Sequence, residues 1–569
     1  MRKNILKCIL VLSTIFMFTS CEDFFQVETD DILDNKDYIS TDSEMYSGYI
    51  GITTKLQAIG DKIIYLTDTR GELLEPTINT PSELTNLYFY NDDLSGNSYA
   101  DPAPYYDVII ACNDYIYKMF EYKKTHHSSI DETHFKALIS STLRVKAWIY
   151  LTLGKIYGEA VWFDDPMTEK KDLSKLPLKK LDEIVTSCRL LLESGIDGID
   201  GKLSISWKEW VDPETSTGDS EFRYWDYMTP DYIPLYAEIC LWDEDYQKVV
   251  DIILTKLNEK FAHTNLDGNN IDWLRSTALA GKFARIWDTK GKDPLRIEAI
   301  SIIQYNYEYN QINSLLKHFG TERPNQYLLA PSEAGRARFS DPDFNNLGIK
   351  DKDAREGISF RKTSADQWVI NKFRPSPSQA RANAYEDDVL IYIYRATELH
   401  FMLAEALNQL GRYAEAAALI NSGVSGVFPN GNVTWPGFSN DWTSATQHGT
   451  RAYPNVGIRG AFNLGNRDFF KEPKEDGAPV VDGENLLSDL TIEEIGQAKL
   501  KNDLAILDEM LLEFPVEGKI YPAMIRIAKR HNDYSIIADR VCPKYQNGED
   551  IRTRILNGAY FIKWDLKNK

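Results

Sequence analysis

Residues 391–424, with the sequence IYIYRATELHFMLAEALNQLGRYAEAAALINSGV, decide the fold class of this chain. Apolar residues recur three and four positions apart, which is typical of one face of a helix. Residues 231–260 carry the same pattern, and the two stretches repeat one another at identical offsets: Tyr236-Ala237-Glu238, Tyr246, Val250 and Ile253 match Leu403-Ala404-Glu405, Tyr413, Ala417 and Ile420.

Each repeat has the pattern of a helix, a tight turn and a second helix. A small Ala on the first helix lets its partner approach, and the aromatic residue eight positions after the Glu opens the second helix. This is the tetratricopeptide pattern. A weaker third copy lies at 147–157, where Gly154 permits close helix contact. Because such helix pairs bury their apolar faces only by stacking, we predict one contiguous scaffold, whose repeat residues contact no ligand.

Four further windows show helical periodicity: 105–121, 134–158, 179–194 and 498–514. Between the helices lie long segments rich in Gly, Asn, Asp, Pro and aromatic residues: 68–104, 195–230, 264–380 and 425–490. Loops of this length are uncommon in a compact domain without a functional reason. We therefore expect these segments to be ordered against the helices.

The N-terminus has the pattern of an export signal. Basic residues precede an apolar run at 8–18, which is well short of the ~20 residues that a membrane-spanning helix needs. Thr19-Ser20-Cys21 follows, and a cysteine after small residues is where lipoprotein processing attaches diacylglycerol. We predict that Cys21 is acylated and that several acyl chains anchor the protein stably. The alternative is an ordinary signal peptide with an incidental cysteine.

The composition of the chain limits the classes of partner that it can bind. The chain has 569 residues, of which 43% are hydrophobic, and a formal charge of −21. A surface this acidic repels phosphate backbones and anionic headgroups, so we expect no nucleic-acid partner and assign membrane attachment to the lipid. The body of the chain contains Cys112, Cys188, Cys240 and Cys542 without CxxC spacing. One pair could form a disulfide in an exported protein, but their apolar helical contexts favour four buried thiols.

Several motifs together resemble one protein family. They are LRVKAWIY at 143–150 leading to Ile156-Tyr157-Gly158 and Pro166, YRATELHFMLAEA at 394–406, Pro331-Ser332-Glu333 before Asp353-Ala354-Arg355, and Glu509, Glu513, Glu517-Gly518, Tyr521 and Arg526. Their spacing resembles the starch-utilisation-system D-like (SusD/RagB-like) outer-membrane lipoproteins over nearly the whole chain. In the last motif, Tyr521 stands where the family has Trp and Ala523 where it has Asp, which leaves a local packing and salt-bridge detail open.

The resemblance implies an all-α, tetratricopeptide-like superhelix with an irregular, loop-rich capping subdomain. It implies a signal peptide at 1–20, an N-terminal repeat-containing region at 21–263, a capping region at 264–390, and a C-terminal region at 391–569 with a helix pair and a long loop insertion. It further implies a lipid-anchored, cell-surface protein of the outer membrane that captures oligosaccharides for a SusC-like TonB-dependent transporter. No catalytic residue, cofactor or metal site is implied.

The resemblance also indicates a ligand site. In the family an Asp precedes, by some twenty residues, two aromatic residues spaced two apart, and Asp68, Tyr88 and Tyr90 fit that arrangement with Arg70 beside the Asp. Alternation along an extended segment places both tyrosines on one side, where a ring can stack on a sugar. Trp273 and Trp287 lie in the later segment that supplies the other wall of the family's pocket. The alternative is that the tyrosines are simply packed against the helices.

Two other function classes remain open. A surface glycoside hydrolase or lyase would use an acid pair such as Asp341 and Asp343, held ~5–9 Å apart, and a peptide-binding uptake subunit would use the repeat surface. The chain has no G-x-S-x-G, H-E-x-x-H or phosphate-binding loop. Glu398 and Glu405 lie on one helical face with Arg395 within a turn, which indicates a buried structural charge network and not a catalytic pair.

Overall fold

The computed structural model describes residues 39, 41–126, 132–166, 175–194, 196–197, 204–205, 227–258, 283–287, 298–340, 353–374, 380–443, 454–470 and 491–564. Predicted features outside these ranges are the signal at 1–20, Cys21, Trp273, and the Asp341 and Asp343 pair. All structural statements below concern the described ranges.

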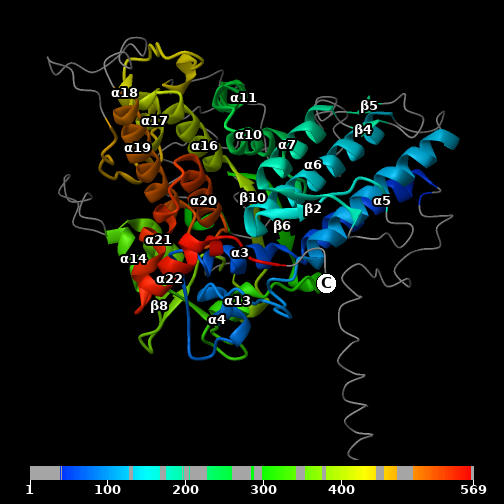
Figure 1. The fold of residues 1–569 in the computed structure, drawn as a ribbon, viewed down its shortest axis with the longest axis horizontal. Helices are drawn as coiled ribbons and strands as arrows, with labels where there is room; N and C mark the ends of the chain where they lie inside the picture. Colours follow the sequence, from blue (N-terminus) through cyan, green and yellow to red (C-terminus); the bar gives the residue numbers. More distant parts are fainter. Residues whose placement is uncertain are drawn as a thin grey trace, which may run out of the picture.

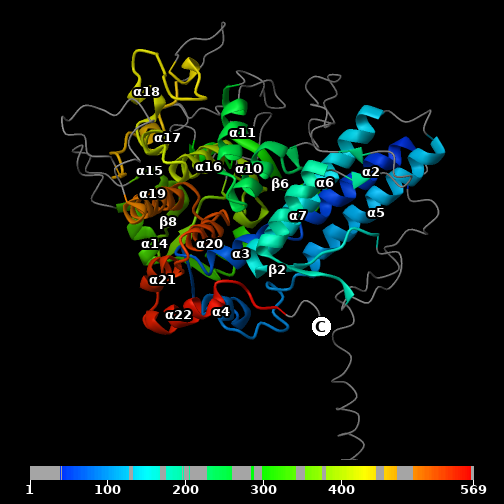
Figure 2. The ribbon, with the colours of Figure 1, turned by 45° about the horizontal axis from the view of Figure 1, so that its top comes forward.

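Helices dominate the fold, which confirms the predicted tetratricopeptide-like architecture. The longer helices are α2 (Asp42–Leu56), α3 (Gly60–Asp68), α5 (Ala103–His126), α6 (Glu132–Tyr157), α7 (Leu181–Ser194), α10 (Tyr232–Trp242), α11 (Tyr246–Asn258), α16 (Ala396–Gln409), α17 (Tyr413–Ile420), α19 (Ile492–Glu513) and α20 (Ile520–Arg530). Consecutive helices pack in pairs, with α5 on α6, α6 on α7, α10 on α11 and α16 on α17. Figures 1 and 2 show these pairs in a row from α5 to α19.

The weaker third repeat also contains a close contact between two helices. A Cβ atom on Gly154 of α6 would lie 2.9 Å from Cδ1 of Leu181 and 3.4 Å from Cδ1 of Ile184, both on α7. Only a residue without a side chain allows α6 and α7 to approach this closely. The prediction that Gly154 permits close helix packing is therefore confirmed.

The shorter elements are strand pairs, short helices and helical turns. The strand pairs are β1 (Leu74–Pro76) with β7 (Leu329–Pro331), β2 (Glu159–Val161) with β3 (Leu178–Lys180), β4 (Ile196–Asp197) with β5 (Ser204–Ile205), and β8 (Phe360–Lys362) with β9 (Trp368–Ile370). The short helices are α4 (Ser82–Tyr88), α13 (Leu315–Phe319), α14 (Glu333–Ala337), α15 (Ala354–Ser359), α18 (Gly423–Val427), α21 (Ser535–Val541) and α22 (Gly548–Arg554). The remaining helical turns are η4 (Phe283–Arg285), η5 (Tyr307–Tyr309), η6 (Arg338–Ser340), η8 (Ala384–Glu386), η9 (Asn440–Trp442), η10 (Gly460–Phe462), η11 (Cys542–Lys544) and η12 (Ile555–Ala559).

One helix prediction is wrong at its start. Residues 391–395 belong to strand β10 (Val389–Arg395), which pairs antiparallel with β6 (Ala299–Tyr305), and α16 begins only at Ala396. Every residue of β10 is buried. A fully buried strand is a continuous apolar run, and periodicity alone does not distinguish such a run from a buried helix. Its isoleucines and tyrosines are types enriched in strands.

A buried ion network joins the loop-rich part to the helices. Arg355, at the start of α15, donates to Asp353 (2.7 Å), Glu509 (2.6 Å) and Glu513 (2.8 Å), and the side chains of all four residues are fully buried. Arg395 pairs with Glu298 at 2.5 Å and with Glu513 at 3.0 Å. Several motif residues of the sequence are thus partners in one network. Because an unpaired buried charge costs several kcal/mol, about 3–5, the network fixes the position of the irregular segments.

The predicted structural role of the two glutamates on α16 is confirmed. Glu405 accepts hydrogen bonds from Arg526 Nη2 at 2.7 Å and from Arg530 Nη2 at 2.5 Å. Glu398 pairs with Lys519 at 3.0 Å and also accepts from the backbone N–H of Arg395 at 2.9 Å. Both carboxylates are buried.

The cysteines in the described part of the chain carry free thiols. Cys112, Cys188 and Cys240 are buried, and Cys542 is half-buried. None of the described helices combines the length and hydropathy that crossing a membrane requires. The described residues also contain no group of three or more His, Cys, Asp or Glu side chains placed to hold a metal ion.

Candidate functional site

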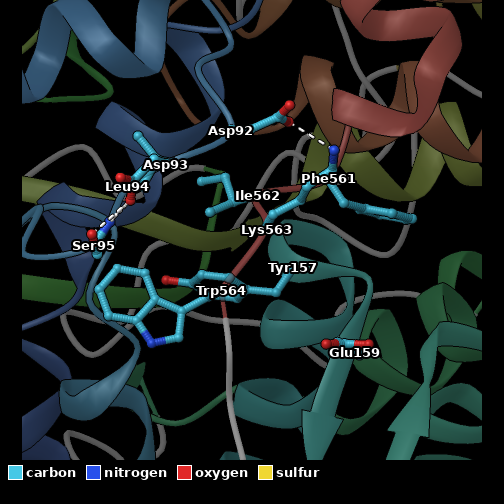
Figure 3. Close-up of a pocket in the computed structure, with 10 residues that line it drawn as sticks. All are labelled: Asp92, Asp93, Leu94, Ser95, Tyr157, Glu159, Phe561, Ile562, Lys563 and Trp564. Atoms are coloured by element: carbon cyan, nitrogen blue, oxygen red, sulfur yellow. Dashed lines mark hydrogen bonds and ion pairs between the residues drawn. The ribbon is translucent and has the colours of Figure 1, made fainter. Parts of the chain in front are cut away.

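An open pocket of about 550 Å³ lies where three distant segments meet. Its lining residues are Asp92, Asp93, Leu94 and Ser95 from the loop after α4, Tyr157 and Glu159 from the end of α6 and from β2, and Phe561, Ile562, Lys563 and Trp564 from the C-terminal segment. Figure 3 shows these side chains around the pocket. The volume is within the range of ~300–1,000 Å³ that is usual for ligand sites.

The C-terminal wall of the pocket is held by the end of α6. The N–H of Ile562 donates to the carbonyl of Ile156 at 2.9 Å. The next residue but one, Gly158, has a φ of +74°, and a Cβ atom there would lie 2.5 Å from the Phe561 ring. The glycine thus serves both the backbone turn and the close approach of Phe561.

The opposite wall is the loop at 91–97. Ser95 donates to Oδ1 of Asp93 through its backbone N–H at 3.0 Å and through its hydroxyl at 2.6 Å, which closes the loop on itself. An ion pair of 2.7 Å between Lys563 Nζ and Asp92 Oδ1 crosses from one wall to the other. Both side chains of the ion pair are more than half exposed. The pair therefore links the two segments but contributes little to the stability of the protein.

The third side of the pocket is formed by Tyr157 and Glu159. Tyr157 is buried and donates to the carbonyl of Ala100 at 2.8 Å. Burial keeps its pKa well above the ordinary value of a tyrosine, so the hydroxyl is neutral. Glu159 is half-buried and forms an ion pair with Lys180 on the neighbouring strand β3.

Trp564 gives the pocket an aromatic face that solvent can reach. Its side chain is half-buried, as is that of Phe561, whereas Asp92, Asp93 and Ser95 are exposed. In the view of Figure 3 the indole extends toward Leu94 and Ser95, and Glu159 lies on the other side. A flat aromatic ring beside a few polar groups is suited to a sugar, whose C–H face stacks on the ring while its hydroxyls bond to the polar groups.

Two of the predicted ligand residues, Arg70 and Tyr90, lie directly behind this pocket. Arg70 donates to the carbonyl of Tyr560 at 3.3 Å and also to that of Ala559. Its guanidinium carbon lies 4.5 Å from the ring centroid of Tyr90, whose hydroxyl donates to the carbonyl of Arg70. Arg70 and Tyr90 are 3% and 2% exposed. In this structure they support the segment that forms the C-terminal wall, and their contact with a glycan stays a prediction.

The predicted extended segment at 88–90 is wrong. Helix α4 ends at Tyr88, Phe89 is its C-cap, and Tyr90 has a φ of +55°. The seven residues of α4 carry the helical spacing of Leu84, Leu87 and Tyr88, which are buried, and this outweighs the alternation of the three aromatic residues. Phe89 is 43% exposed.

Tyr88 and Asp68 both contact other residues inside the protein. The Tyr88 ring lies 4.5 Å from that of Tyr545, and the Lys544 ammonium is 4.5 Å from its centroid. Asp68 accepts from the backbone N–H of Gly518 at 2.7 Å. Burial raises the pKa of Asp68 to about 7, because the Gly518 N–H and the nearby Lys372 offset the loss of hydration only in part.

Trp287 lies in the core. It is 1% exposed and packs edge to face against Phe283 at 5.3 Å and Tyr392 at 6.3 Å. Lys372 Nζ lies 4.4 Å from its ring centroid. Trp273 lies outside the described residues.

The pocket residues on the C-terminal segment were not singled out from the sequence. A signal was present, because Ile562 and Trp564 alternate with Lys563 after two aromatic residues, as in a segment with one face against the protein. The partners of the segment are far away in the chain: Lys563 and Asp92 are 471 positions apart.

Comparison with known proteins gives a family match and a common fold. Residues 245–422 match the model of the SusD family. A SusD superfamily protein from Bacteroides vulgatus ATCC 8482 is 11% identical with a TM-score of 0.59, and the match covers 92% of this chain and 94% of that one. A laminarin binding SusD-like protein is 13% identical with a TM-score of 0.53, covering 92% and 98%. Surface glycan-binding protein A from Bacteroides uniformis is 14% identical with a TM-score of 0.53, covering 92% and 94%. At these identities the structures establish the fold alone, and no curated protein matches the sequence.

Proposed function

This chain is a SusD/RagB-like protein, and from that premise we propose that it is a cell-surface glycan-binding protein whose ligand occupies the pocket between residues 92–95, Glu159 and Trp564. Two proteins of the same fold are named for their ligands, one as a laminarin binding protein and the other as a surface glycan-binding protein. Their ligands support a glycan as the ligand class here.

The observation that carries the proposal is the half-buried indole of Trp564 beside exposed polar groups in a pocket of about 550 Å³. A pyranose ring stacks its C–H face on the indole. The carboxylates of Asp93 and Glu159 accept hydrogen bonds from hydroxyls of the sugar, and Ser95 offers a further polar contact. The proposed role is binding, without bond cleavage.

The remaining parts of the proposal come from the sequence. Acylation of Cys21 anchors the protein in the outer membrane, and a SusC-like TonB-dependent transporter receives the bound oligosaccharide. The supporting observations are the signal pattern before Cys21 and the family match at 245–422.

Calorimetry with the protein from Glu22 onward and a panel of oligosaccharides tests the proposal. We expect one glycan class to bind without turnover, and Trp564→Ala to weaken its binding at least about tenfold, since stacking on an aromatic ring contributes on the order of 1–3 kcal/mol. Tyr309→Ala is the matched control, because Tyr309 is 77% exposed and lies outside the pocket.

Three results contradict the proposal in different ways. Turnover of the glycan indicates the hydrolase or lyase. Binding of peptides alone indicates the peptide-uptake subunit. An equal loss of affinity in Trp564→Ala and Tyr309→Ala, or no loss in either, places the glycan elsewhere on the protein.

A further inference from the structure

The charged groups of the pocket are mostly carboxylates. Asp92, Asp93 and Glu159 line it, whereas Lys563 is the only cation among the lining residues that the structure describes. An ionised carboxylate only accepts hydrogen bonds. The pocket therefore presents acceptors, and it fits a ligand that supplies donors.

The cations at the pocket already have partners. Lys563 pairs with Asp92 at 2.7 Å, and Lys180, on the neighbouring strand, pairs with Glu159. Arg70, behind the C-terminal wall, is buried and directs its guanidinium to the carbonyls of Ala559 and Tyr560. An anionic ligand that pairs with Lys563 breaks the ion pair between Lys563 and Asp92. The Asp92 carboxylate then lies unpaired, close to the negative charge of the ligand.

We propose that this pocket selects uncharged oligosaccharides and rejects the same glycans when they carry carboxylate or sulfate groups. The inference rests on the proposed function. A sugar hydroxyl donates to Asp93 or Glu159, whereas an ionised acidic group has no proton to donate and is repelled by these carboxylates. Two like charges a few ångströms apart near a protein surface are worth about a tenfold change in affinity or more.

A matched pair of ligands isolates this charge effect. The neutral oligosaccharide that binds is compared with its own derivative in which primary hydroxyls are oxidised to carboxylates, and with the methyl ester of that derivative. Linkage and chain length are then the same in all three. We expect the carboxylate form to bind at least about tenfold more weakly and the methyl ester to recover most of the loss.

A variant assigns the effect to the pocket. In Asp93→Asn the amide oxygen still accepts from Ser95, but the negative charge is removed. The ratio of affinities for the neutral and the carboxylate ligand should therefore fall several-fold. Asp366→Asn is the control, because the Asp366 side chain is 83% exposed and lies outside the pocket. It should leave the ratio unchanged.

The outcomes separate the inference from the function on which it rests. Equal or tighter binding of the carboxylate form, or binding of acidic glycans alone, overturns the inference and leaves a glycan receptor. A methyl ester that binds as weakly as the carboxylate assigns the loss to size and also overturns it. Absence of binding to any glycan overturns the proposed function and the inference together.

Discussion

The ring of Phe561 occupies the space that a side chain at Gly158 would need. A Cβ atom on Gly158 would lie 2.5 Å from Cδ2 of Phe561, and the glycine has a φ of +74°. Gly158 directly follows α6, and Phe561 lines the pocket. The contact therefore links the helical scaffold to the C-terminal wall of the site.

Replacing this glycine should loosen the wall. We expect Gly158→Ala to lower the free energy of unfolding by about 2–4 kcal/mol, since a positive φ and an overpacked contact each cost on the order of 1–3 kcal/mol. Gly431→Ala is the control, because Gly431 has a φ of +91° but its Cβ would meet only Thr443 Oγ1, at 3.7 Å. Urea denaturation should show the larger loss for Gly158→Ala, and calorimetry should show weaker glycan binding for that variant alone. Equal losses in the two variants would assign the effect to backbone strain.

Acid should weaken the contact between α16 and α20. Burial alone would raise the pKa of Glu405, but the guanidinium groups of Arg526 and Arg530 outweigh it and lower this pKa to about 2, against 4.5 for an unperturbed glutamate. A lowered folded-state pKa contributes stability that is complete above about pH 4.5 and is lost as the pH falls toward about 2. Glu405→Gln should cost about 3–5 kcal/mol at pH 7.

Denaturation of both proteins at several pH values checks this prediction. The difference in free energy of unfolding between the natural protein and Glu405→Gln should shrink between pH 4.5 and pH 2.5. A difference that stays constant over this window contradicts the assigned pKa shift.

Asp68 should have the opposite pH dependence. Burial raises its pKa in the folded protein to about 7 from an ordinary 3.8. The folded state therefore binds the proton more tightly than the unfolded state, and stability falls as the pH rises from about 4 to about 7. Asp68→Asn keeps an oxygen for the Gly518 N–H and removes the ionisation. Its melting temperature relative to the natural protein should rise between pH 5 and pH 8, and a relative melting temperature that is flat or falls contradicts the raised pKa.

The helical scaffold was predictable because its signal is local. Ala237 and Ala404 mark helices whose partners follow within a few residues, so periodicity and offset suffice to identify the pairs. The same reasoning failed at Ile391, where a short apolar run is a strand that pairs with residues near 303, almost ninety positions earlier. Strand pairing over such a distance has no signature in the run itself.

The site was predictable only in part for the same reason. The resemblance to the family grouped Arg70 and Tyr90 as candidate ligand residues, and the two side chains are in contact. Arg70 donates to the carbonyls of Ala559 and Tyr560, which come from the other end of the sequence. The pocket is formed by Trp564 and the loop at 92–95 together. No local sequence pattern predicts that these two segments are in contact.

The thiols should react in an order set by burial. Burial raises the pKa of Cys112 and of Cys240 to about 12, and Cys188 is buried as well. Cys542 is only half-buried. With a disulfide reagent at pH 8, the protein from Glu22 onward, which lacks Cys8 and Cys21, should show one faster thiol, which Cys542→Ala removes, and four thiols after denaturation. Fewer than four thiols in the denatured, unreduced protein would reveal a disulfide.

Arg70→Lys distinguishes a supporting role from direct contact with the glycan. Lysine keeps the positive charge but lacks the planar fork that donates to the carbonyls of both Ala559 and Tyr560 and that lies over the Tyr90 ring. If Arg70 acts by holding the C-terminal wall, the variant loses about 1–3 kcal/mol of stability and binds the glycan more weakly. Lys563→Met, which leaves Arg70 in place, should have little effect on stability, since the ion pair of Lys563 with Asp92 is exposed. An Arg70→Lys protein that unfolds like the natural one but no longer binds the glycan would instead show that Arg70 contacts the ligand itself.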